Sequence, residues 1–228
     1  MKHWQHVFKL DPAKEITDDA IEAICLSGTD AIIVGGTDDV TAENVYDLLM
    51  RIQRYELPII LEISTMDAIV YGFDYYFIPM VMNSKDKKWM MDIQHEAIKQ
   101  FRPFIDWQEM VAEGYCILNE RAKAYERAAC KMPDEDAVIA YADMAEHIFN
   151  FPIFYIEYSG TYGSPELVER VKYSLDRTLL FYGGGIASET EAKEMKEHAD
   201  VIVVGNVIYT NLPSALQTVS AIKGTEKI

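Results

Sequence analysis

The sequence has little of what marks fibrous, secreted or membrane-spanning proteins. Its 228 residues include only 12 glycines and 8 prolines, scattered without a period, which excludes collagen-like and low-complexity structure. No apolar run approaches the roughly 18 residues of a membrane span, and the segment from Met1 to His6 lacks the apolar core of a signal peptide. Three cysteines, an odd number, argue against a disulfide framework. We therefore expect a reduced, cytoplasmic protein.

Positive charge is also scarce. Lys and Arg number 21 against 37 Asp and Glu, which gives a net charge of −16. No cluster of basic residues is present to neutralise a nucleic-acid backbone, so nucleic acid is excluded as a partner. The same charge disfavours broad adhesion to anionic lipid. A small anionic substrate stays open, because a single pocket can be locally positive.

Half of the residues are hydrophobic, and they fall into eight apolar runs of strand length. Most runs are apolar on both faces, as parallel strands covered by helices are. The segments between them carry helix start signals, such as the capping box from Ser188 to Glu191 and Ser164 before Pro165. The eight runs span residues 7–10, 31–34, 59–63, 75–82, 115–118, 153–158, 178–182 and 201–204.

Eight alternating units predict an α/β fold, a single-domain (β/α)₈ TIM barrel over residues 1–228. A doubly wound open sheet is the competing fold, but its usual G-x-G-x-x-G does not follow the first run. The third crossover, from Ser64 to Asp74, is shorter than the dozen residues that a helical crossover needs. We therefore predict that the third helix is missing or reduced.

Glycines cluster where three of the predicted strands end. Gly160 follows the sixth strand, Gly185 ends a triple glycine after the seventh, and Gly205 and Asn206 follow the eighth. Each glycine alone would suit a tight turn. Together, at the carboxyl ends of barrel strands, they favour a phosphate cradle made of backbone N–H groups.

Polar side chains at the same rim share strand faces. Alternation places Lys9 with Asp11, and Tyr155 with Glu157 and Ser159, toward the barrel mouth. Lys supplies a point charge for phosphate, and Asp is a hard oxygen ligand suited to Mg²⁺. The alternative is a structural ion pair between Lys9 and an Asp.

Other features have structural interpretations. His95 and Glu96 begin like a zinc-protease helix, but Lys99 stands where the second histidine is required, so we expect a solvent-facing helix. His6 is expected to be structural. The segment 70–91 is dense in aromatic residues and Met beside the short third crossover, which suits a groove for a flexible hydrocarbon as well as ordinary packing.

Five motifs, in order along nearly the whole chain, resemble the geranylgeranylglyceryl phosphate synthase family, and its bacterial, PcrB-type branch most closely. The motifs are Phe8-Lys9-Leu10-Asp11-Pro12, Ile33-Val34-Gly35-Gly36-Thr37-Asp38, Tyr155-Ile156-Glu157-Tyr158-Ser159-Gly160, Tyr182-Gly183-Gly184-Gly185-Ile186 and Val203-Val204-Gly205-Asn206. The resemblance implies a barrel without a regular third helix. It also implies a Mg²⁺-dependent prenyltransferase that joins sn-glycerol 1-phosphate to a long allylic prenyl diphosphate, and a homodimer.

The resemblance also implies roles for particular residues. Asp11 and Thr37 would hold Mg²⁺, and Tyr155 and Glu157 are the candidate catalytic residues. Whether Glu157 accepts the proton of the hydroxyl or only orients the diol stays open. The residues implied to bind glycerol phosphate are Lys9, Tyr155, Ile156, Glu157, Tyr158, Ser159, Gly160, Gly185, Gly205 and Asn206.

The resemblance implies the length of the prenyl donor through one residue. The small Ala97, where the archaeal branch tends to carry a larger residue, would let a heptaprenyl tail pass, with geranylgeranyl as the alternative. The resemblance leaves room for transient contact with a membrane.

The competing functions are a sugar-phosphate isomerase or aldolase, and a non-catalytic lipid- or flavin-phosphate-binding barrel. A chain-elongating prenyl synthase is disfavoured, because the segment from Asp38 to Ala42 lacks the last aspartate of D-D-x-x-D.

Overall fold

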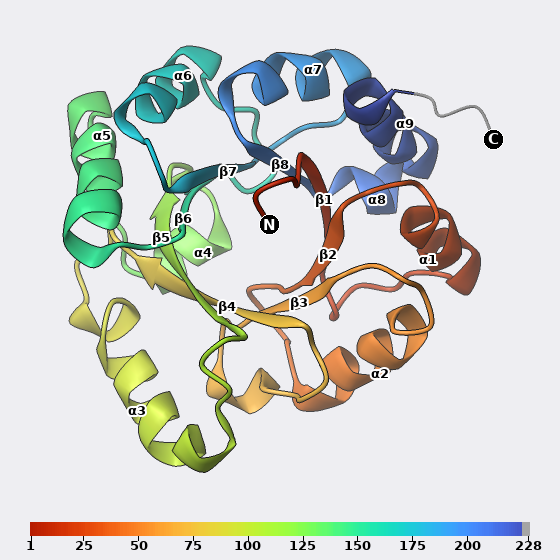
Figure 1. The fold of residues 1–228 in the computed structure, drawn as a ribbon, viewed down its shortest axis with the longest axis horizontal. Coiled ribbons are helices and arrows are strands. Elements are labelled where there is room, and N and C mark those ends of the chain that lie inside the picture. The colour runs from red at the N-terminus through yellow and green to blue at the C-terminus, as the bar shows by residue number, and fades with distance from the viewer. Residues whose placement is uncertain (225–228) are drawn as a thin grey trace.

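The computed structural model describes residues 1–224, in which eight parallel strands close into a ring with each strand paired to the next and β8 paired to β1. Helices surround the ring (Figure 1). The strands are β1 (His6–Leu10), β2 (Ala31–Val34), β3 (Ile59–Glu62), β4 (Tyr75–Val81), β5 (Met110–Ile117), β6 (Ile153–Glu157), β7 (Leu179–Gly183) and β8 (Val201–Val204). This confirms the predicted TIM barrel and excludes the doubly wound sheet.

The helices follow the strands in alternation. None of those in residues 1–224 is long and apolar enough to cross a membrane. The α-helices are α1 (Asp18–Cys25), α2 (Ala42–Ile52), α3 (Asp92–Phe101), α4 (Lys123–Arg127), α5 (Glu135–Asp143), α6 (Pro165–Ser174), α7 (Glu189–His198), α8 (Val207–Thr210) and α9 (Leu212–Lys223). Short turns of other helix types are η1 (Met66–Ala68), η2 (Lys87–Trp89), η3 (Arg102–Phe104) and the π-helix η4 (Met144–Phe149). Residues 225–228 of the predicted domain lie outside the described residues.

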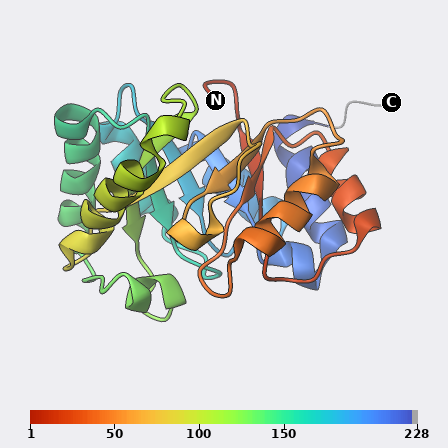
Figure 2. The same ribbon diagram turned by 90° about the horizontal axis from the view of Figure 1, so that it is seen from below.

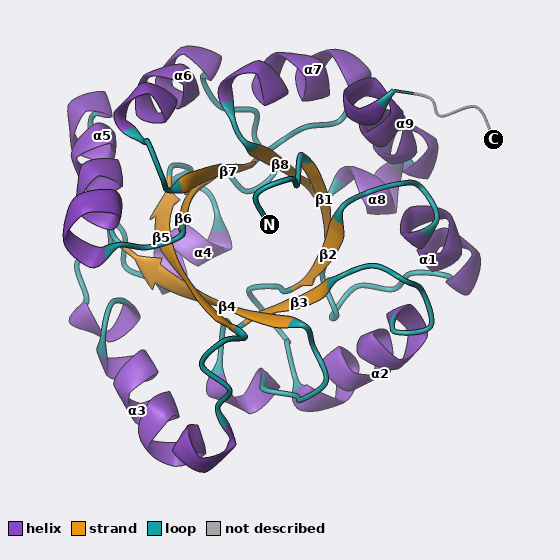
Figure 3. Ribbon diagram, in the orientation of Figure 1, coloured by secondary structure: helices purple, strands orange, loops and turns teal. Residues whose placement is uncertain are grey.

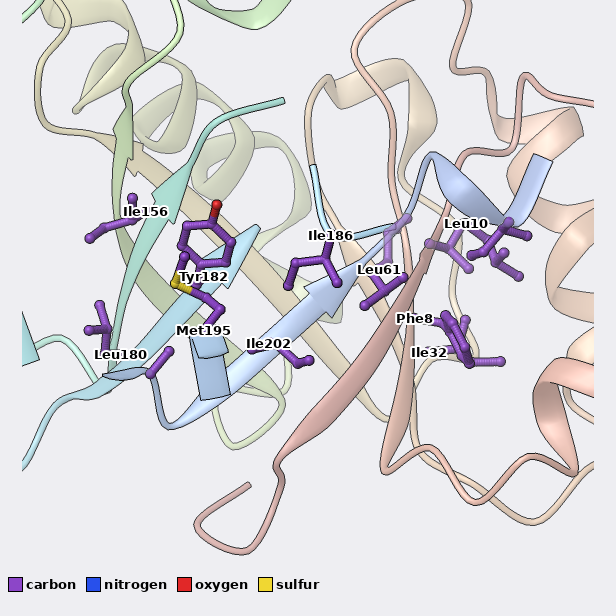
Figure 4. Close-up of a cluster of buried hydrophobic side chains, with 14 of the residues drawn as sticks. Phe8, Leu10, Ile32, Leu61, Ile156, Leu180, Tyr182, Ile186, Met195 and Ile202 are labelled. Carbon is purple, nitrogen blue, oxygen red and sulfur yellow. The ribbon is translucent and has the colours of Figure 1, made fainter. Parts of the chain in front are cut away.

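Side chains of the strands alternate between two apolar cores. Inside the ring, Phe77 and Phe181 meet edge to face with centroids 6.2 Å apart. Outside it, residues such as Ile156, Leu180 and Ile202 pack between strands and helices (Figure 4). The strands are apolar on both faces because each face is covered, as the sequence predicted.

The third crossover contains only the short turn η1 between β3 and β4, which confirms the prediction of a reduced helix. Figure 3 shows the ring of strands with this segment between α2 and α3. Ile78 and Met80 on the outer face of β4 are consequently only half-buried. The reduced crossover therefore leaves these two apolar side chains partly exposed on the side of the barrel.

The predicted fifth strand, residues 115–118, was wrong in its bounds. Strand β5 begins at Met110 and ends at Ile117. Glu113 and Gly114 break the apolar run, and a buried carboxyl inside a barrel is too unusual to be anticipated from periodicity. The strand nevertheless continues through them, because both neighbouring strands pair with it there.

Helix starts follow the predicted signals. Ser164 accepts a hydrogen bond from the N–H of Leu167 with Pro165 in the first turn, and Ser188 accepts one from the N–H of Glu191. Such caps satisfy N–H groups that a helix leaves unpaired at its start.

His6 has a structural role at the amino end of β1, away from the barrel mouth. Its Nδ1 lies 3.0 Å from Thr29 Oγ1 and its Nε2 2.9 Å from Thr218 Oγ1, which joins β1 to α9. Burial lowers the pKa of His6 from 6.5 to about 3. The folded protein therefore contains the neutral imidazole.

We expect His6 to destabilise the protein in acid. The unfolded chain takes up a proton on this residue below pH 6.5 while the folded chain does not until about pH 3, so the free energy of unfolding falls as pH drops between these values. At about 1.4 kcal/mol per pKa unit, the loss reaches roughly 5 kcal/mol. His6→Gln should flatten this acid limb in urea unfolding curves, whereas His3→Gln, at an exposed position, should not. If the free energy of unfolding depends equally on pH in wild type and His6→Gln, His6 is not the buried neutral group responsible.

Candidate active site at the barrel mouth

Seven of the strands and the loop after β2 line a cavity of about 760 Å³ at the carboxyl ends of the strands. Figure 2 shows this end of the barrel opposite the N-terminus, with α4 projecting beyond it. Active sites of TIM barrels lie at this face, because the βα loops meet there.

One side of the cavity is built from glycine loops after β6, β7 and β8. Gly185 has φ +60°, and a Cβ there would lie 2.2 Å from the Tyr162 nitrogen, so only glycine fits. A Cβ on Gly160 would lie 2.6 Å from Asn206 Nδ2, which shows how closely the loops after β6 and β8 approach. Lys14 Nζ donates to Asn206 Oδ1 at 3.1 Å. The loops converge as expected, and the arrangement suits an anion.

Lys9 lies in the floor of the cavity and forms an ion pair with Glu62, with Nζ 2.6 Å from Oε1. Burial opposes its charge, but the carboxylates of Glu62 and Glu157 together raise the pKa of Lys9 above the ordinary value. The sequence left open a structural ion pair between Lys9 and an aspartate. The structure shows that Lys9 pairs instead with Glu62, a glutamate on β3. Glu62 could have been found from the sequence, because it is a charged residue near the end of the apolar run 59–63 and therefore lies at the same rim as Lys9.

Glu157 is held by two donors. Its Oε2 accepts a hydrogen bond from the Tyr115 hydroxyl at 3.0 Å, and its Oε1 accepts one from the N–H of Ser159. Burial raises the pKa of Glu157, opposed by Lys9 and by the Ser159 N–H. A raised pKa makes this carboxylate a better proton acceptor than an exposed one.

Tyr155 is fully buried and stacks on Tyr115 with ring centroids 4.7 Å apart. A Cβ on Gly183 would lie 2.3 Å from the Tyr155 hydroxyl, so the glycine makes room for this ring. Among the described residues, the hydroxyl has no hydrogen-bond partner. Burial raises the pKa of Tyr155 well above its usual value, which keeps the phenol neutral.

Glu113 on β5 was not predicted as a site residue from the sequence. Its side chain is inaccessible, and neither carboxyl oxygen has a hydrogen-bond partner within residues 1–224. Burial, reinforced by the charge of Glu62, raises the pKa of Glu113 well above 4.5. We interpret this side chain as a neutral carboxylic acid.

Asp11 and Thr37 lie on the side of the cavity formed by the loops after β1 and β2. A Cβ on Gly36 would lie 2.5 Å from Asp11 Oδ1, so the carboxylate rests directly against the loop that carries Thr37. Within residues 1–224, no three His, Cys, Asp or Glu side chains are arranged to hold a metal. One carboxylate and a hydroxyl fit Mg²⁺ only when substrate phosphate oxygens complete the shell, which is its usual mode of binding.

Three predicted residues lie outside the cavity lining. Ile156 and Tyr158 project from the opposite face of the β6 segment, and Figure 4 shows Ile156 in the outer core. Ala97 lies on α3 one helical turn after Ile93, which does line the cavity. The helix is largely exposed, as expected for His95 and Glu96.

A group of cations near the mouth was also missed. Arg121, Lys123 and Arg127 line the cavity from α4 and the loop before it. Their sequence spacing resembles an ordinary solvated helix face, so periodicity alone gave no reason to separate them from other surface charges.

The fold, the glycine loops and the buried carboxylates together define a TIM-barrel enzyme that acts on phosphate esters. The PcrB family model matches residues 1–223, and the chain belongs to that family. It is 61% identical to heptaprenylglyceryl phosphate synthase of Anoxybacillus flavithermus over 97% of this chain and 96% of the relative. It is 60% identical to that of Oceanobacillus iheyensis, over 98% of both chains.

A solved structure supports the fold. (S)-3-O-geranylgeranylglyceryl phosphate synthase from Thermoplasma acidophilum, in complex with sn-glycerol-1-phosphate, superposes with a TM-score of 0.85 at 24% identity. The match covers 97% of this chain and 94% of that one.

The neutral state of Glu113 has a measurable consequence. A carboxyl whose pKa is raised by folding contributes its stability below pH 4.5, and this contribution is lost as pH rises toward the folded pKa. Glu113→Gln, which stays neutral, should therefore gain stability relative to wild type as pH is raised from 5 to 8. Urea unfolding measures the difference. The exposed Glu126→Gln serves as control; a wild-type–E113Q difference that does not change with pH would show that Glu113 is ionised.

Proposed function

We propose that this chain joins sn-glycerol 1-phosphate to a long allylic prenyl diphosphate, heptaprenyl diphosphate, forming an ether-linked prenylglyceryl phosphate and releasing diphosphate. The activity named for relatives at 61% and 60% identity supports this reaction. The proposal is carried by one observation: Glu157, the glycine loops and the pair Asp11 and Thr37 line the same cavity.

The glycerol phosphate would bind with its phosphate at the glycine loops. Gly160, Gly185, Gly205 and Asn206 supply backbone N–H groups and an amide near one another. Ser159, next to them, has φ 43° and turns the chain toward the cavity. The backbone of Ile156 and Tyr158 shapes the start of this loop, since their side chains point away.

The glycerol end would lie toward the floor of the barrel. Lys9 and Glu157 stand there, and both line the cavity. Glu157 retains acceptor capacity beyond its bonds from Tyr115 and Ser159, so it can accept from a glycerol hydroxyl. Fixing the phosphate and the diol at once presents the remaining primary hydroxyl to the donor.

In the reaction, the hydroxyl oxygen forms a bond to the allylic carbon while the bond from that carbon to diphosphate breaks. The hydroxyl proton passes to Glu157, and the rings of Tyr115 and Tyr155 face the same region as Lys9, whose Nζ lies 5.9 and 5.7 Å from their centroids. Aromatic faces favour positive charge, so they suit an allylic carbon that becomes electron-poor. Mg²⁺ held by Asp11 and Thr37 would neutralise charge on the departing diphosphate.

The hydrocarbon tail would leave the mouth on the side of β4 and α3. Pro79, Val81, Trp89 and Ile93 line the cavity there and are largely apolar. Ile78 and Met80, which are half-buried beside the reduced third crossover, lie on the same strand as Pro79 and Val81.

The aldolase alternative is disfavoured by Lys9. A Schiff base requires a neutral amine, whereas Glu62 and Glu157 stabilise the charged one and raise the pKa of Lys9. A non-catalytic binding protein is tested directly: mixing labelled sn-glycerol 1-phosphate with a ladder of prenyl diphosphates should release diphosphate and yield an ether lipid. No product with any donor would refute the proposed function.

The homodimer and the cytoplasmic location are further parts of this proposal, and they derive from the family resemblance. Sedimentation of the purified chain tests the first, and fractionation of cells that express it tests the second.

Glu157→Gln keeps the size of the side chain and one of its two acceptor oxygens but removes its basicity. We expect turnover to fall by about 10²–10⁴-fold, the usual contribution of a general base, while the dissociation constant of glycerol phosphate changes little. The matched control is Glu189→Gln, at an exposed site on α7. A parallel loss of binding and turnover would instead assign Glu157 to orienting the diol.

Ala97→Trp tests the chain-length hypothesis. If the tail passes along α3 beyond Ile93, the added bulk should shift the preferred donor from heptaprenyl to shorter prenyl diphosphates. Lys99→Trp adds the same bulk at an exposed position of the same helix and should not. An unchanged donor profile in A97W would refute this position as the ruler.

A further inference from the structure

We propose that α3 and the turns at its two ends form a surface that docks on a lipid bilayer. The inference rests on the proposed function and extends it, because it names the phase from which the enzyme takes its prenyl donor. The residues of this α3 surface are Met91, Ile98, Phe104 and Trp107, with the cations Lys88 and Arg102.

The position of α3 is the first argument. The helix lies outside β4, beside the reduced third crossover (Figures 1 and 3). None of its residues is buried, whereas α2 buries four and α6 three. Gln94 ties one side of α3 to the barrel, since its Nε2 donates to the backbone oxygens of Pro79 at 3.2 Å and Trp89 at 3.3 Å. The remaining sides of α3 are uncovered by the described chain.

Exposed apolar side chains on and after α3 are the second argument. Met91 is 59% exposed, Phe104 69% and Trp107 59%. Met91 and Ile98 are about two helical turns apart, so they share one side of α3. Phe104 also meets the exposed ring of Tyr71 edge to face, with centroids 6.3 Å apart. The apolar groups therefore continue from the start of α3 past its end.

Local charge is the third argument. Residues 85–107 contain five Lys and Arg against four Asp and Glu, so this segment is nearly neutral in a chain that carries −16. Lys88 and Arg102, which stand before and after α3, form no ion pair within residues 1–224. Because salt screens charges beyond about 8 Å, a lipid surface against α3 would meet these cations rather than the remote carboxylates.

The combination of side chains suits the region between lipid head groups and acyl chains. Segments that lie in this region carry Trp and Phe beside Lys and Arg, because the rings enter the apolar layer while the cations meet anionic head groups. The whole-chain charge disfavours broad adhesion to anionic lipid, so the contact is confined to the α3 surface.

A second exposed apolar group, on η4, lacks this combination. It consists of Met144, Ile148 and Phe149. Its charged neighbours are Asp143 and Glu146, and the sequence has no Lys or Arg between residues 140 and 152. Charge complementarity with anionic lipid therefore favours α3 over η4.

The proposed donor gives this contact a purpose. Each CH₂-sized group of a prenyl tail gains about 0.8 kcal/mol by leaving water, so a tail of about seven isoprene units stays in a bilayer. Ile93 and Gln94 line the cavity from the side of α3 that faces the barrel. A bilayer against the neighbouring side of the same helix would bring the donor to the cavity without a passage through water.

A second copy of the chain is the competing occupant of the α3 surface. A two-fold interface would place this surface against itself and would bring the unpaired cations of two copies together, which is unfavourable. Anionic head groups attract the same cations. The structure therefore favours lipid over a second copy.

Flotation of the full chain with lipid vesicles tests the assignment. We expect binding to phosphatidylcholine vesicles that contain phosphatidylglycerol, and weaker binding to phosphatidylcholine alone. Ile98→Ser and Phe104→Ser should each weaken binding about tenfold, because each removes an apolar side chain from the contact. The matched control is Leu26→Ser, at an exposed position after α1. Wild type that floats with neither vesicle, or binding of both α3 variants within twofold of wild type, would overturn the proposal.

The cations are tested separately. Lys88→Gln and Arg102→Gln should weaken binding several-fold only when the vesicles contain phosphatidylglycerol, and Lys193→Gln, on the exposed surface of α7, should bind as wild type. An equal loss in all three variants would indicate general electrostatic adhesion and overturn the assignment to α3. Sedimentation identifies the competing occupant: if Ile98→Ser or Phe104→Ser turns a dimer into a monomer, the α3 surface binds a second copy instead.

Kinetics separate this inference from the proposed function. If wild type makes no ether product with any donor, the function fails, while the flotation result still decides whether α3 binds lipid. If wild type is active, Phe104→Ser should raise KM for heptaprenyl diphosphate presented in vesicles about tenfold and leave KM for sn-glycerol 1-phosphate within twofold. An unchanged KM for the vesicle-borne donor would show that α3 does not deliver it from the bilayer.

Discussion

The centre of the barrel depends on one buried cation. Within residues 1–224, Lys9 is the basic residue whose charge acts on both Glu113 and Glu157, and it pairs directly with Glu62. Three ionised carboxylates around a single ammonium would be too costly to bury, so the interior must hold at least one proton more than exposed groups would. Glu113, without a hydrogen-bond partner in the described residues, is where the geometry places that proton. Glu157, with two donors and Lys9 nearby, is then free to ionise at the mouth.

This arrangement explains how a strongly acidic chain handles anionic substrates. The carboxylates of Glu62 and Glu157 lie inside the barrel beside Lys9, while further cations line the cavity nearer its rim. Lys14 lies beside the glycine loops, and Arg127 on α4 lies beside the β2 loop. The net charge of the whole chain therefore says little about the potential that a substrate meets at the mouth.

Much of this could be predicted from sequence, for reasons that differ between parts. The fold followed from periodicity, and the short third crossover followed from counting residues. Strand alternation placed Lys9, Glu157 and Ser159 on inward faces. The pairing of Lys9 with Glu62, 53 residues away, could not be predicted, because it depends on the register of strands around a closed ring. Glu113 was missed for a related reason: a carboxyl inside an apolar strand is interpreted as the end of that strand. The α4 cations were missed because a solvated helix face and a ligand-binding face have the same spacing until the cavity is known.

The reduced third crossover has a consequence for substrate size. In a complete TIM barrel the helices form an unbroken wall, and a ligand that enters at the mouth can grow only upward into solvent. Here the wall is interrupted beside β4, where Ile78 and Met80 are half-buried. If the hydrocarbon of the proposed donor leaves the cavity on this side, its length is not limited by the volume enclosed by the strands. Selection for longer or shorter lipids can then act on the flank of the barrel without disturbing the groups that make and break bonds.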